Sequence, residues 1–107
     1  MDTTMATAVP HPTLNELLIL LEEIHSKITD GSDMVWGWYE TPAQLRSDLE
    51  KYARQLQQGD LTCGKELQLL FLPTSVLQEH SIQNGWSQEY LTLSTTFDRL
   101  YAELWQS

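Results

Sequence analysis

Apolar residues recur in this sequence at the spacing of an α-helix, and each such segment has a recognisable start signal and stop signal. Between residues 13 and 30, leucine and isoleucine occur every three or four positions, with polar residues between them. This spacing places the apolar side chains on one helical face that must be buried. Thr13 and Glu16 have the spacing of a capping box, and Asp30-Gly31 is typical of a helix end. The pattern predicts a first helix between these signals.

A second helix has the clearest boundaries in the chain. Thr41 is suited to accept a hydrogen bond at the helix start, Pro42 suits the first helical position because it lacks an N–H group, and Gln44 completes a capping box. Leucines follow at helical spacing as far as Gly59, a favoured residue after a helix end. We expect a helix from Pro42 to just before Gly59.

A third helix is expected between Asp60, which can cap it, and Pro73, which ends it. Gly64 lies inside this segment and lowers its helical stability by up to about 1 kcal/mol. Cys63 lies near the helix start, where a lowered pKa would make it a nucleophile. The alternative, which we favour, is that this lone cysteine is buried and packs as a small hydrophobic residue.

Two more helices complete the prediction. Ser75 opens a short helix of two or three turns, which stops at Asn84-Gly85. Trp86 follows this turn, and we expect its ring to fill a junction between helices. The last helix starts near Ser87 and continues almost to the C-terminus, with apolar residues close to a two-in-seven spacing.

The predicted fold is all-α. Runs of alternating apolar and polar residues, which are typical of strands, do not extend over more than a few positions. Short connections favour antiparallel neighbours, so we expect a compact antiparallel bundle of four or five helices with an aromatic-rich connection between the first two. Residues 1–12 are small, polar and interrupted by prolines, and they predict a mobile tail; residues 13–107 form a single helical domain.

Charge and composition argue against several classes of function. The chain has six basic and fifteen acidic residues, a net charge of −9, which repels nucleic acids and anionic lipids. The run from Leu17 to Leu21 is far too short to span a membrane, and the N-terminal sequence lacks the features of a signal peptide. A single cysteine forms no intramolecular disulfide. We expect a soluble cytoplasmic protein that binds neither nucleic acid nor membranes.

The sequence offers few candidates for chemistry. Glu22 and His25 have the spacing of half a helical di-metal site, but there is no second Glu-x-x-His pair. No serine lies in a Gly-x-Ser-x-Gly motif, and Gly64-Lys65-Glu66 lacks the residues of a phosphate-binding loop. We therefore expect no metal, no cofactor and no catalytic residues, and hence no enzyme.

An aromatic segment between the first two helices is the candidate binding site. Trp36, Trp38 and Tyr39 can each bury about 150 to 250 Å², so something must cover them. One interpretation, which we favour, is that the segment folds back over one end of the bundle and closes it. The other is that exposed rings anchor a partner, with Asp33 and Glu40 providing an acidic rim. On this hypothesis the partner-binding residues are Asp33, Trp36, Trp38, Tyr39 and Glu40.

Three functional hypotheses follow. The first is a small acidic, non-catalytic domain that binds another protein, with a basic partner as one option, in the manner of an adaptor, inhibitor or immunity protein. The second is a small-ligand-binding or enzymatic domain with a pocket between helices under the aromatic segment, with His25 or His80 as candidate polar groups. The third is a homodimer formed through an apolar face of the last helix.

Overall fold

The protein is an all-α bundle, as the sequence predicts. The computed structural model describes residues 11–32, 39–72 and 75–106, and these residues form helices with no strand among them. The helices are α1 (Pro12–Lys27), α2 (Pro42–Gln57), α3 (Gly64–Leu70), α4 (Val76–Gln83) and α5 (Ser87–Trp105). None of them, within the described ranges, combines the length and apolar content required to cross a membrane.

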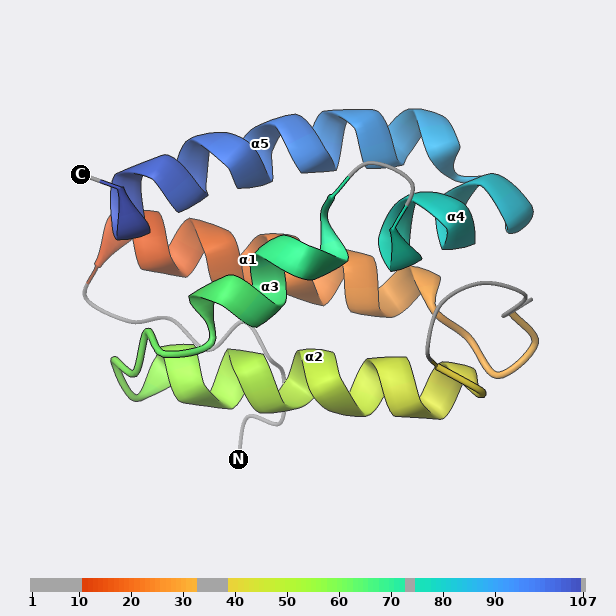
Figure 1. Ribbon diagram of the computed structural model, residues 1–107, viewed down its shortest axis with the longest axis horizontal. Helices are drawn as coiled ribbons and strands as arrows, with labels where there is room; N and C mark the ends of the chain where they lie inside the picture. The colour runs from red at the N-terminus through yellow and green to blue at the C-terminus, as the bar shows by residue number, and fades with distance from the viewer. Residues whose placement is uncertain (1–10, 33–38, 73–74, 107) are drawn as a thin grey trace.

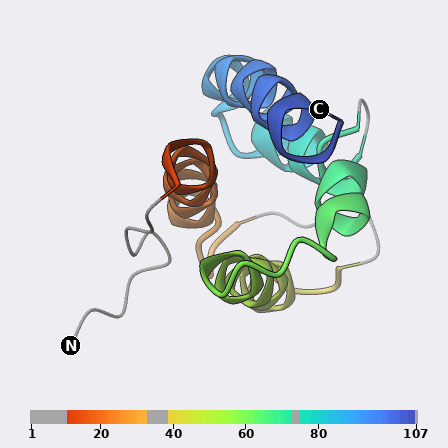
Figure 2. The ribbon, with the colours of Figure 1, turned by 90° about the vertical axis from the view of Figure 1, so that its left-hand side faces the viewer.

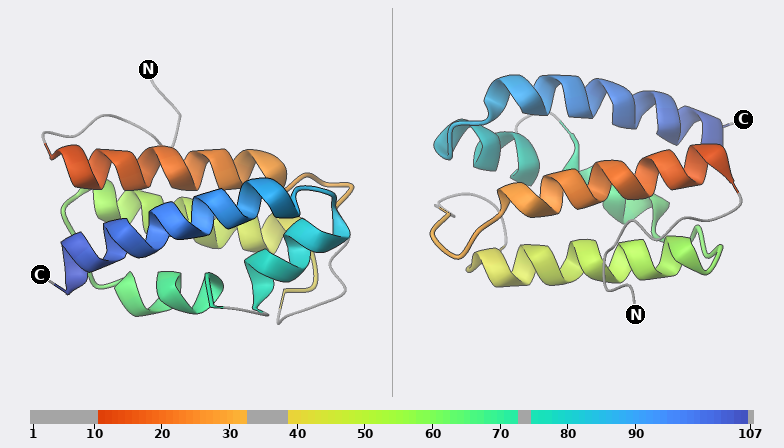
Figure 3. Two further views of the ribbon diagram at one scale, coloured as in Figure 1. Left: turned by 90° about the horizontal axis from the view of Figure 1, so that it is seen from above. Right: turned by 180° about the vertical axis from the view of Figure 1, so that it is seen from behind.

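The two N-terminal helices and the long C-terminal helix form the frame of the bundle. In Figure 1, α1 lies between α2 and α5, and the views in Figure 3 show α3 and α5 running in opposite directions. Figure 2 looks along the bundle and shows α1, α2, α3 and α5 surrounding a common centre, with α4 beside α5. Leucines from every helix meet there, including the fully buried Leu17, Leu45, Leu67, Leu77 and Leu100. Each such side chain contributes about 1.5 to 3 kcal/mol through burial.

The start of α2 confirms the predicted capping box. Thr41 Oγ1 accepts a hydrogen bond from the backbone N–H of Gln44 at 3.3 Å. In return, Gln44 Oε1 accepts from the backbone N–H groups of Glu40 at 2.7 Å and Thr41 at 3.4 Å. The helix ends before Gly59, whose φ of 79° is a conformation that glycine adopts without steric cost. Both boundary predictions are correct because every interaction involved is local.

The predicted cap of the first helix is wrong. The N-cap is His11, whose ring Nδ1 accepts from the backbone N–H of Leu14 at 3.2 Å, and Pro12 occupies the first turn. Thr13 lies inside α1, where its hydroxyl donates to Glu103 Oε1 at 3.1 Å. The fixed φ of Pro12 suits the first helical position, so the helix begins two residues earlier than expected. It also ends earlier, at Lys27.

The expected start of the third helix is also wrong. Asp60 Oδ1 accepts from the backbone N–H and the hydroxyl of Thr62, at 3.0 and 2.7 Å, and this local turn delays the helix until Gly64. A Cβ atom on Gly64 would overlap the indole of Trp105, lying 2.6 Å from its Cε2. That indole donates to Leu61 O at 2.8 Å. Gly64 thus allows the end of α5 to lie directly against the start of α3.

The segment from α4 to α5 agrees with the sequence in position, although not in every contact. Ser75 precedes α4 as predicted, but its hydroxyl donates to Leu69 O at 2.8 Å instead of capping the helix. Trp86 is 4% exposed, and its Nε1 donates to His80 Nδ1 at 3.1 Å. The prediction that Trp86 fills a helix junction is confirmed.

Substitution of the two threonines distinguishes the real cap from the apparent one. We expect Thr41→Ala to lower the free energy of unfolding by about 1 kcal/mol, because the first turn of α2 loses its side-chain acceptor. Thr13→Ala should cost less than about 0.5 kcal/mol, since it removes only an exposed hydrogen bond. Urea denaturation followed by circular dichroism measures both. Equal losses would contradict the assignment of the caps.

Gly64 should be intolerant of a side chain. We expect Gly64→Ala to lower the free energy of unfolding by about 1 to 2 kcal/mol, because the new methyl group displaces the Trp105 indole. Gly31→Ala is the matched control, because a Cβ there has no neighbour within 4 Å. Chemical denaturation should show the loss at Gly64 alone. The same loss in both variants would instead indicate a general effect of glycine replacement.

Candidate functional site

A groove lies between the end of α3 and α5, and we call it the α3/α5 groove. It encloses about 360 Å³. Most of its lining comes from α5, and the rest from the end of α3, the two residues that follow it and one residue of α4: Gln68, Phe71, Leu72, Gln78, Tyr90, Leu91, Ser94, Phe97 and Asp98. The groove exists because α3 is short and meets α5 along only part of its length.

The floor of the α3/α5 groove is aromatic and its rim is aliphatic. Phe71 and Phe97 stack with ring centroids 3.8 Å apart and an interplanar angle of 3°, and Tyr90 lies next to Phe71 at 6.3 Å. These three rings are buried, whereas Leu72 and Leu91 at the rim are 43% and 54% exposed. Two exposed leucines beside a recess of this kind form a surface suited to an apolar ligand group.

The charge on the described lining of the groove is negative. Asp98 is exposed on α5, and no basic side chain is among the groove's lining residues in the described part of the chain. Burial, and then the charge of Asp98, raises the pKa of Tyr90 to about 12, so this phenol is neutral at physiological pH. The Tyr90 hydroxyl donates to Phe71 O at 3.4 Å. The groove therefore favours an apolar group accompanied by a cation.

A row of aromatic side chains, which the sequence prediction of the site does not include, runs along α5 from its N-cap residue Trp86 to Trp105. From Trp86 to Trp105 the aromatic residues on this helix are separated by four, seven, four and four positions, which keeps them on one helical face. Neighbouring rings lie 5.9 Å apart for Trp86 and Tyr90, 5.7 Å for Phe97 and Tyr101, and 5.0 Å for Tyr101 and Trp105. Phe71 from α3 fills the seven-residue interval. The regular spacing of the α5 aromatic residues is the sequence feature from which this part of the site could be predicted.

The predicted partner-binding segment is only partly described. Asp33, Trp36 and Trp38 lie outside the described residues. Tyr39 is 8% exposed, and its hydroxyl donates to Asp48 Oδ2 at 2.6 Å, so this ring packs inside the bundle. Glu40 is exposed next to the start of α2. Neither Tyr39 nor Glu40 lines the α3/α5 groove.

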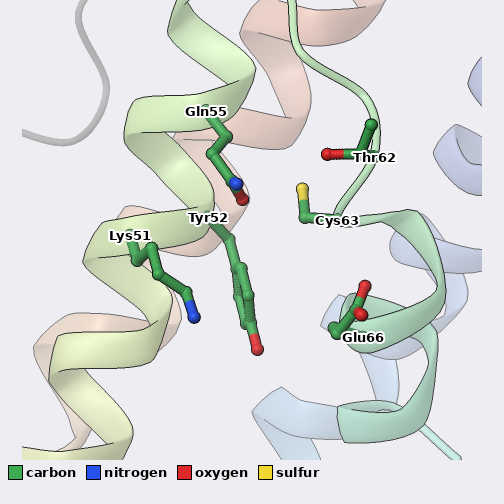
Figure 4. Close-up of a pocket in the computed structure, with 6 residues that line it drawn as sticks. All are labelled: Lys51, Tyr52, Gln55, Thr62, Cys63 and Glu66. Carbon is green, nitrogen blue, oxygen red and sulfur yellow. The ribbon is translucent and has the colours of Figure 1, made fainter.

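A second, smaller cavity lies between α2 and α3. Figure 4 shows Lys51, Tyr52 and Gln55 projecting from α2 toward Thr62, Cys63 and Glu66 across a space of about 140 Å³. Cys63 is 3% exposed, and burial raises its pKa to about 11. Burial also raises the pKa of Tyr52, with a further contribution from Asp48. The cavity thus presents a protonated thiol, as expected for a cysteine that packs as a hydrophobic residue.

The histidines make contacts within the bundle. His25 Nε2 lies 2.8 Å from Glu50 Oε2 and joins α1 to α2. The ring of His80 is 3% exposed and packs edge-on against Trp86, with centroids 5.6 Å apart. Neither histidine lines the α3/α5 groove. Across residues 11–32, 39–72 and 75–106, no three histidine, cysteine or acidic side chains come together in a group that could hold a metal ion.

No protein-family model, curated protein or solved structure matches this chain. The functional interpretation therefore depends on the residues themselves. The features that bear on it are the α3/α5 groove with its two exposed leucines, the negative charge of the chain, and a buried thiol in the second cavity.

The buried thiol of Cys63 predicts a particular pH dependence of stability. Its pKa is raised in the folded chain from an ordinary value of 9.0 to about 11, so the folded state holds its proton more tightly. This contribution to stability is complete below about pH 9 and is lost as the pH rises toward 11. We expect Cys63→Ala to reduce the alkaline decline in the free energy of unfolding, measured in urea from pH 8 to pH 11. An unchanged decline would contradict the burial of the thiol.

Proposed function

We propose that this chain is a small, non-catalytic helical domain that binds another protein. The observation that supports the proposal best is the α3/α5 groove, where Leu72 and Leu91 remain about half exposed above a buried aromatic floor. When a partner covers exposed leucines beside a recess, the complex is stabilised by roughly 25 cal/mol for each Å² of apolar surface removed from water. Scattered surface leucines would not provide such a combined site.

The charge of the chain supports a basic partner. Fifteen acidic residues outnumber six basic ones, and three of those six, Lys27, Arg46 and Arg99, already form ion pairs with carboxylates of the chain. The remaining charge is strongly negative. A positively charged protein would therefore be attracted over distances of about a Debye length, roughly 8 Å at physiological salt.

The contacts of the reactive side chains favour binding over catalysis. A cysteine acts as a nucleophile when its thiol is deprotonated or assisted by a base. The raised pKa of Cys63 keeps its thiol protonated instead. His25 is engaged by Glu50, and His80 is packed against Trp86. These groups support the bundle from within and lie away from the α3/α5 groove.

A small-ligand function is the second candidate, because a recess of about 360 Å³ is within the range of ligand pockets. The exposed rim favours a protein instead. A small ligand would leave much of Leu72 and Leu91 in water, whereas a protein segment lying along the groove would cover both leucines. The predicted segment Asp33–Glu40 is retained in the proposal as a second contact surface.

Affinity capture with matched surface variants tests the proposed function. The tagged chain is incubated with native lysate at low salt, alongside Leu91→Gln in the groove and Ile19→Gln on α1. Leu91 is 54% exposed and Ile19 is 49% exposed, so the two side chains are similarly accessible and differ in location. We expect a specific set of proteins that the wild type and Ile19→Gln capture and that Leu91→Gln loses.

A third variant separates the two proposed surfaces. Trp38→Ala combined with Asp33→Lys alters the predicted segment and leaves the groove intact. Loss of the captured proteins in this variant alone would assign binding to that segment. Equal recoveries from all variants, or none from any, would refute binding through the groove.

A further inference from the structure

We propose that the α3/α5 groove binds a single amphipathic helix of a basic partner, with the helix lying along α5 and a lysine or arginine of the partner next to Asp98. This inference rests on the proposed function and deepens it by naming the chemistry of the partner. It follows from the length of the groove, the distribution of its apolar groups and the sign of its charge.

The length of the groove fits two turns of a helix. Its α5 side runs from Tyr90 to Asp98, eight residues along the helix axis, or about 12 Å at 1.5 Å per residue. Apolar anchors at positions i, i+4 and i+7 of a partner helix span roughly 10 Å. Three anchors can therefore lie within the groove at once.

One wall of the groove is the helix α5, along which a partner helix can pack; the other is the end of α3 with the two residues after it, Phe71 and Leu72. α3 and α5 run in opposite directions on its two sides (Figure 3). A helix lying between them packs its side chains between Leu72 from the α3 side and Leu91 from the α5 side, above the stacked rings of Phe71 and Phe97. This is the arrangement by which helices bury an apolar face against a pair of neighbours.

The charge of the groove determines which helix fits. Among the described lining residues the charged one is Asp98, and Ser94, one turn earlier on α5, is half-buried and adds no charge. A cation on the partner next to Asp98 would pair with it at the edge of the apolar contact. A second copy of this chain is disfavoured as occupant, because each copy has a net charge of −9 and the two would repel each other.

Binding of a designed peptide tests this inference. The probe is a lactam-bridged helical peptide of about 15 residues, labelled with fluorescein, with leucines at i, i+4 and i+7 and lysines at the positions that flank this leucine face. We expect saturable binding by fluorescence anisotropy. Leu91→Gln should weaken the affinity about fivefold or more, and Ile19→Gln should leave it unchanged.

The salt dependence tests the contribution of Asp98 separately. We expect Asp98→Asn to weaken binding about threefold at low salt, and the difference from wild type to disappear at high salt, because the lost interaction is an exposed ion pair. A peptide with glutamates in place of the lysines should not bind. Equal affinity for the acidic peptide would overturn the proposed partner chemistry.

Two further controls make each outcome decisive. A peptide of the same composition with leucines distributed around the helix must bind more weakly, and equal binding would overturn the inference.

Sedimentation of the free chain tests whether a second copy of this chain occupies the groove instead. A dimer that Leu91→Gln disrupts would assign the groove to that second copy and overturn the inference. If the basic peptide fails while Leu91→Gln still abolishes capture from lysate, the partner is not a basic helix but the proposed function stands; if both fail, neither stands.

Discussion

The stacking of Phe71 on Phe97 is the contact on which the position of α3, and with it the α3/α5 groove, depends. The two rings lie parallel, 3.8 Å apart between centroids, and join the end of α3 to the middle of α5. At the opposite end of α3, Gly64 allows the Trp105 indole to approach and to bond Leu61. A helix of seven residues is thus held against α5 at both ends. The groove extends beside the Phe71–Phe97 contact, on the side where Leu72 and Leu91 reach the surface.

Local sequence signals predict the start of α2 correctly, but at α1 and α3 a competing local contact moves the start of the helix. The capping box of Thr41 and Gln44 involves residues three positions apart, and it was predicted correctly. Thr13 has the same sequence signal, yet His11 and Pro12 begin the helix and Thr13 bonds Glu103. From its sequence position alone, Gly64 is expected to weaken a helix. Its actual role, the approach of Trp105, involves a residue 41 positions later in the chain.

The candidate site was harder to predict than the fold for the same reason. The sequence directed attention to Asp33–Glu40, where large rings are adjacent, although Tyr39 packs inward against Asp48. The groove instead combines Phe71 with Phe97, and Leu72 with Leu91, pairs that are brought together only when α3 folds back along α5. The periodic aromatic residues of α5 gave a partial signal, because they marked the helix face. They could not show which part of that face α3 would leave uncovered.

Nuclear Overhauser spectroscopy on a sample labelled only at phenylalanine tests the central claim most directly. The chain contains two phenylalanines, Phe71 and Phe97, so any ring-to-ring cross-peak between different residues can only connect this pair. The stacked geometry predicts strong cross-peaks between the two rings in the free protein. Two assigned ring systems with no cross-peak between them would contradict the docking of α3 on α5, and with it the α3/α5 groove.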